Sequence, residues 1–84
     1  MKYRFIEDPG HGWLEVQVSE IQRLGVGQKI SRYSYLKGDR ASLEEDCDLS
    51  VFMKAKEQAG EPVEMVRVYQ EHTPIRNYDS WGQR

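Results

Sequence analysis

The sequence contains one cysteine, two histidines, three prolines and no long hydrophobic run. A single cysteine excludes an internal disulfide framework, and neither histidine has the spacing that marks a metal site. The start, residues 1–6, is too short and too early charged for a secretory signal, and nothing is long and apolar enough for a transmembrane helix. These absences favour a soluble cytoplasmic protein without a metal, a cofactor or a membrane partner.

Neither sign of charge dominates, since 12 Lys and Arg residues face 14 Asp and Glu residues and the net charge is −2. A dedicated nucleic-acid binder normally has a clear basic excess, so direct binding of nucleic acid is disfavoured. A hydrophobic content of 38% suits a globular protein, and 84 residues allow one domain. We expect a single domain over 1–84, with a compact core over about 2–70 and a tail over 71–84.

The spacing of apolar residues predicts seven elements. These are strands over 2–6 and 11–18, a helix over 19–24, strands over 29–36 and 41–45, a helix over 49–59 and a strand over 63–70. The last strand has apolar side chains on both faces, which predicts a central or helix-covered position. The predicted fold is an α+β two-layer sandwich, with an antiparallel sheet of about five strands in the order ββαββαβ and two helices on one face.

An acidic run is the most informative local feature. Its carboxylates come from Asp39, Glu44, Glu45, Asp46 and Asp48, with only Arg40 of opposite charge among them. Acidic residues before a helix commonly cap its amides, so local capping by Asp46 or Asp48 is one interpretation. The other is an acidic surface that a basic partner recognises, with carboxylates in the place of phosphates. The spacing does not match a calcium-binding loop.

Aromatic residues add a second candidate feature. Tyr33 and Tyr35 share one face of the predicted strand over 29–36, where they would either stack on bases or pack beneath the helices. Trp13 alternates away from the apolar residues of its own strand, so we expect it to be exposed and to anchor a partner. The predicted partner-binding residues are therefore Asp39, Glu44, Glu45, Asp46, Asp48, Trp13, Tyr33 and Tyr35.

Catalytic chemistry has weak support. Cys47 follows three acidic residues, a setting that raises the pKa of a thiol and weakens it as a nucleophile. His11 lies between two glycines at a predicted turn, and His72 lies in the tail. We predict no enzyme and no catalytic residue, and a small metal-dependent enzyme built on His11, His72 and Cys47 is the least favoured alternative.

Three runs, HGWLEV at 11–16, ISRYSY at 30–35 and LEEDCD at 43–48, resemble small proteins of bacterial genomes, prophages and other mobile elements. The resemblance covers roughly residues 3–59 and implies no catalytic residue. It implies an accessory protein that binds and blocks a host protein, similar in size and charge to anti-CRISPR inhibitors.

The predicted function is a non-catalytic protein-interaction module, whose acidic face binds the basic surface of a nucleic-acid-handling protein. A sheet that binds single-stranded nucleic acid through Tyr33 and Tyr35 is the main alternative. A homodimer is compatible with the sequence, because so short a chain builds only a thin core.

Overall fold

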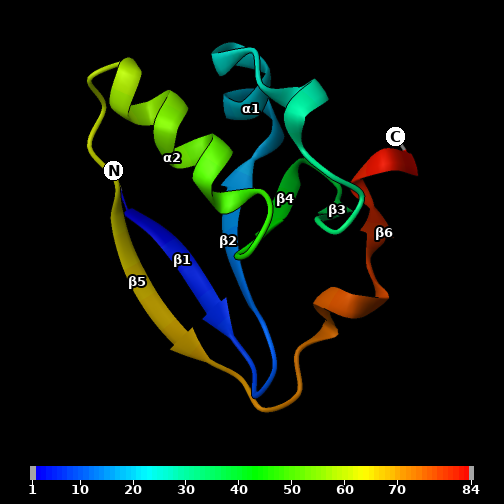
Figure 1. Cartoon of the computed structure of the whole chain (residues 1–84). Helices are drawn as coiled ribbons and strands as arrows, with labels where there is room; N and C mark the ends of the chain where they lie inside the picture. Colours follow the sequence, from blue (N-terminus) through cyan, green and yellow to red (C-terminus); the bar gives the residue numbers. More distant parts are fainter. Residues whose placement is uncertain (1, 84) are drawn as a thin grey trace.

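Six strands form one mixed sheet in this computed structural model, which describes residues 2–83 (Figure 1). They are β1 (Lys2–Glu7), β2 (Gly12–Gln17), β3 (Tyr35–Lys37), β4 (Arg40–Glu44), β5 (Glu64–Tyr69) and β6 (Asp79–Ser80), in the spatial order β5-β1-β2-β4-β3-β6. The α-helices are α1 (Val18–Leu24) and α2 (Leu49–Gln58), and the 3-10 turns are η1 (Gly27–Lys29), η2 (Pro74–Asn77) and η3 (Trp81–Gln83). No helix within residues 2–83 has the length and apolar character needed to cross a bilayer.

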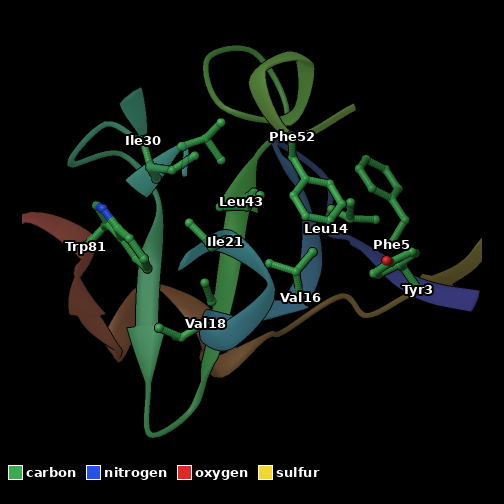
Figure 2. Close-up of a cluster of buried hydrophobic side chains, with 12 residues drawn as sticks. Tyr3, Phe5, Leu14, Val16, Val18, Ile21, Ile30, Leu43, Phe52 and Trp81 are labelled. Atoms are coloured by element: carbon green, nitrogen blue, oxygen red, sulfur yellow. The ribbon is translucent and has the colours of Figure 1, made fainter. Parts of the chain in front are cut away.

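The main core lies between the helices and one face of the sheet (Figure 2). The period-two alternation of β2 places Leu14 and Val16 on this face, and Leu14 pairs with Phe5 of β1 and Leu43 of β4. Phe52 of α2 is fully buried against this layer, and its ring meets that of Tyr3 edge-on at a centroid distance of 5.6 Å. Each such side chain contributes roughly 1.5–3 kcal/mol by burial, so a few of them hold both helices on the sheet.

The opposite face carries a smaller core that the tail completes. Ile6 of β1 and Trp13 of β2 are adjacent in register and pack with Ile75 of the tail. Tyr35 and Tyr78 cover the edge of this cluster. The tail therefore runs along the sheet and supplies buried side chains.

A charged cluster links α1 to α2. Lys56 is 2% exposed, and its Nζ lies 2.6 Å from Glu20 Oε2 and 2.8 Å from Glu61 Oε1. Arg23 donates two further hydrogen bonds to Glu61, and the Tyr3 hydroxyl donates to Glu20. Burial alone would lower the pKa of Lys56, but its carboxylate partners outweigh it and raise that pKa. Hydrogen bonds from Arg23 and Lys56 lower the pKa of Glu61 to about 2.

Three predictions about the sheet are wrong. The sheet has six strands rather than about five and is mixed rather than antiparallel, because β5 runs parallel to β1. Parallel strands cannot be joined by a tight hairpin, so the chain must cross over the sheet before it forms β5. The segment between β4 and β5, which contains α2, makes this crossover. β5 is an edge strand instead of a central or helix-covered one, and Met65 and Val66 are exposed there.

The predicted strand over 29–36 is also wrong, since only Tyr35–Lys37 joins the sheet. The carboxylate of Asp48 accepts hydrogen bonds from the amide and hydroxyl of Ser31 and from the hydroxyl of Ser34. These bonds fold the segment into a turn around Asp48. Asp48 immediately precedes α2, but its side chain caps no helical amide, so the capping interpretation fails for this residue.

Candidate functional site

A cleft of about 330 Å³ opens where the hairpin between β1 and β2, the end of β4 and the tail meet. We call it the aromatic–acidic cleft. Its lining residues are His11, Trp13, Tyr33, Tyr35, Glu44, Asp46, Cys47 and Arg76. The rings and the carboxylates come from segments that are distant in sequence, and the strand pairing brings them together.

Strand register positions the inner wall of the aromatic–acidic cleft. Trp13 on β2 lies directly opposite Glu44 on β4, so the two side chains share the face away from the helices. The ring of Tyr35 on β3 meets Trp13 edge-on, with centroids 6.5 Å apart. The ring of His11 stacks on the Trp13 ring with a centroid distance of 5.8 Å and an angle of 21°.

Arg76 of the tail closes one end of the aromatic–acidic cleft. Its guanidinium lies 5.6 Å from the Trp13 ring centroid, 2.7 Å from His11 Nδ1 and 2.9 Å from Asp8 Oδ2. Arginine only donates, so His11 Nδ1 must accept this hydrogen bond. Burial would raise the pKa of Asp8, but the amides of Gly10 and His11 and the Arg76 charge lower it overall. The charge of Arg76 is therefore already balanced within the chain.

The acidic wall has no such internal balance. Glu44 is 8% exposed and accepts the amide of Cys47 at 2.8 Å, while Asp46 is exposed. Among residues 2–83, no ion pair involves Glu44 or Asp46. These two carboxylates lend the cleft a negative charge that a ligand would meet.

Cys47 is exposed beside this wall but is poorly suited to attack a substrate. A hydrogen bond with Glu44 raises the pKa of the thiol, and desolvation and the neighbouring carboxylates act in the same direction. The expected direction of this shift is confirmed. His72 does not line the cleft, and the described part of the chain holds no group of three or more His, Cys, Asp or Glu side chains that could bind a metal ion.

The structure brings together five of the eight predicted partner-binding residues. Around the cleft lie Trp13, Tyr33, Tyr35, Glu44 and Asp46. Asp39 lies instead at the turn between β3 and β4, and Glu45 is exposed outside the cleft lining. Asp48 is 1% exposed, because Ser31 and Ser34 enclose its carboxylate.

One expectation about exposure is corrected. Trp13 was expected to be exposed but is 1% exposed, because His11, Arg76 and the tail cover it. Its indole Nε1 has no hydrogen-bond partner among the described residues. An unpaired buried donor costs about 1–3 kcal/mol, so this position keeps a large ring in spite of a penalty. Tyr33, by contrast, is 64% exposed at the cleft mouth.

Sequence reasoning missed the part played by Arg76 and Asp8. The two residues are 68 positions apart, and only the return of the tail to the hairpin brings them together. A charged residue in a tail of mixed composition gives no local signal of such a contact.

A second cleft has charged side chains that already pair with one another. The cleft of about 220 Å³ beside β1 and β2 is lined by Arg4, Glu15 and Arg40 among others. Both guanidinium groups pair with the same carboxylate there, at 3.9 and 2.7 Å. Of the five clefts compared among the described residues, the aromatic–acidic cleft is the one that combines several rings with carboxylates that form no ion pair.

Comparison of the chain with models of protein families, with curated proteins and with solved structures gives no match. The resemblance to proteins of mobile elements therefore stays a prediction, and function has to be argued from the residues of the cleft.

Proposed function

We propose that this chain is a non-catalytic protein-interaction module whose aromatic–acidic cleft binds a basic side chain of a partner protein. The observation that carries the proposal is that Tyr33, Tyr35 and two carboxylates that form no ion pair within residues 2–83 line one cleft of about 330 Å³. Aromatic faces attract lysine and arginine by cation–π interaction, and carboxylates accept their N–H donors. A cleft of this size accommodates a single long side chain.

The chain already shows this mode of recognition on a neighbouring ring. Arg76 lies over Trp13 while Asp8 accepts its N–H groups, which is a cation held between a ring and a carboxylate. The proposed ligand would repeat the arrangement with Tyr33 and Tyr35 as the rings and Asp46 and Glu44 as the acceptors. Since Arg76 is balanced by Asp8, it does not cancel the negative charge on the far wall.

The partner we propose is the basic surface of a nucleic-acid-handling protein, where these carboxylates would take the place of phosphates. A chain that fills such a surface blocks it, which is how an accessory protein of the anti-CRISPR kind would act. Interactions between exposed charges weaken with ionic strength, because the Debye length is only about 8 Å under physiological conditions. Binding should therefore fall as salt is added.

The first test is fluorescence anisotropy with a labelled arginine-rich peptide as the probe. Asp46→Lys should abolish binding, because it places a cation at the cleft mouth, and Tyr33→Ala should weaken it. Asp39→Lys is the matched control, since it makes the same charge change at an exposed acidic residue away from the cleft. Equal loss of binding in both lysine variants would show that net charge alone drives binding and would reject the cleft.

The geometry disfavours a nucleic-acid-binding sheet. Tyr33 lies in a turn and Tyr35 on β3, so the two rings do not form the flat pair on one strand that base stacking requires. The carboxylates beside them would also repel a phosphate backbone. We expect no binding of single-stranded oligonucleotides at low salt in the same anisotropy assay, and tight binding there would replace the present proposal.

A further inference from the structure

β5 is the open edge of the sheet. It pairs on one side with β1 and is the last strand in the spatial order. At the other edge, β6 is only two residues long. The outer side of this six-residue strand has no neighbouring strand among the described residues, so it forms a template on which another strand can add.

Most of the usual protections against such pairing are absent from β5, although Glu64 and Arg67 are exposed charged residues. Its sequence, EMVRVY, has no proline and no lysine, and both valines are β-branched. Met65 is 36% exposed, Val66 46% and Tyr69 66%. The single basic side chain, Arg67, is held on its own sheet, 2.8 Å from Glu7 and 5.3 Å from the Phe5 ring centroid. The strand therefore offers an apolar and nearly neutral edge.

The backbone hydrogen bonds fix which groups face outward. The amide of Gln70 donates to the Glu7 carbonyl, so even-numbered residues of this strand direct their backbone groups to β1. Because backbone direction alternates along a strand, Met65, Arg67 and Tyr69 direct their N–H and C=O groups to the open side.

We propose that β5 pairs with β5 of a second copy of this chain, antiparallel and about a two-fold axis at Val66. This register makes hydrogen-bonded pairs of Met65 with Arg67 of the second copy, and the reverse, and it sets valine opposite valine at the axis. All residues that it pairs lie within the strand. The edge is self-complementary in this register, so a single two-fold contact pairs the outward backbone groups of Met65 and Arg67 in both copies.

Charge selects this register over its nearest competitor. An axis at Arg67 would also keep the pairs within the strand, but it sets one guanidinium directly opposite another. Like charges in that position are destabilising, whereas Met65 opposite Arg67 places an apolar chain along the arginine stem. The aromatic–acidic cleft is lined by β2, β3, β4 and the tail, so pairing through β5 leaves it open.

Sedimentation equilibrium of the purified full chain over a dilution series tests the pairing. We expect a reversible dimer of twice 9.9 kDa, with a dissociation constant of about 100 μM or lower. Met65→Lys should weaken it about tenfold, because two lysines would each face an arginine. Met65→Glu introduces a charge of the opposite sign at the same position. It should leave the dimer intact or tighten it, because each glutamate would face an arginine. Thermal unfolding at a concentration where both variants are monomeric checks that each still folds.

Amide exchange resolves the register. Protection at Met65 and Arg67 should rise with chain concentration, while Val66 and Val68, whose backbone groups already face β1, should not change. A chain that stays monomeric, or a dimer weakened equally by Met65→Lys and Met65→Glu, would overturn the proposal. Protection of these amides only on addition of a different protein would assign the edge to that partner and reject self-pairing.

Discussion

Replacing Lys56 by methionine should destabilise the fold by about 3 kcal/mol, the lower end of the range for breaking a buried ion pair by removal of one partner. Lys56 is 2% exposed, and its ammonium group bridges Glu20 at 2.6 Å and Glu61 at 2.8 Å. Methionine fills a similar volume but leaves Glu20 charged and largely enclosed. Glu20 keeps the Tyr3 hydroxyl at 2.8 Å and Arg23 at 3.4 Å, which is why we expect the lower end.

Urea denaturation measures this loss directly. A small domain has an m-value of roughly 1 kcal/mol/M, so the midpoint should fall by about 3 M. The melting temperature should fall by about 12–24 °C, since a domain of this size loses about 4–8 °C per kcal/mol. Lys54→Met is the matched control, because Lys54 lies exposed on the same helix and should change stability by less than about 0.5 kcal/mol.

A second variant separates charge from packing. In Lys56→Met combined with Glu20→Gln, no uncompensated charge remains at this site, so part of the lost stability should return. A loss of less than about 1 kcal/mol in the single variant, within the range of an exposed pair, would refute the view that this cluster is a buried and mutually dependent network.

Three further outcomes follow from the geometry. The pKa of Glu61 is lowered from 4.5 to about 2, so its ion pairs contribute stability that is fully present above pH 4.5 and is lost as the pH falls towards 2. Glu61→Gln should therefore reduce the fall in melting temperature between pH 4.5 and 2, and an unchanged fall would contradict this account. Gly12→Ala should cost about 1–3 kcal/mol in urea melts, because its Cβ would lie 2.6 Å from the buried Phe5 ring, whereas Gly10→Ala, with a nearest contact of 3.5 Å, should cost little. Cys47 should react with iodoacetamide more slowly at neutral pH than a free thiol, and faster alkylation would show that its pKa is not raised.

Local pattern predicted the elements whose side chains alternate or repeat regularly. The period-two run in β2 placed Leu14 and Val16 on one face and Trp13 on the other, as the register shows. The helical spacing of residues 49–59 predicted α2 to within a residue of its observed end. These signals depend on neighbours in sequence, so a single chain carries them.

The errors arise where distant residues decide the structure. Most of the β-prone segment over 29–36 forms a turn rather than a strand, because Asp48 accepts hydrogen bonds from Ser31 and Ser34, which lie 17 and 14 positions away. The position of β5 in the sheet depends on the path of the chain through α2, which the residues of β5 do not encode. Its apolar residues on both faces therefore predicted a central or helix-covered strand where the structure has an edge strand. The covering of Trp13 depends on Arg76, which no local pattern links to it.

A titration of the ¹⁵N-labelled chain with a short arginine-rich peptide, followed through its two tryptophan indole N–H signals, tests the proposed binding cleft most directly. Trp13 lines the cleft, while Trp81 packs in the core on the helix side and donates to the Gly27 carbonyl at 3.0 Å. The Trp13 signal should shift with peptide while the Trp81 signal stays, and a peptide with citrulline in place of arginine should shift neither. A Trp13 signal that does not respond, or that responds equally to the uncharged peptide, would contradict a cleft built for a basic side chain.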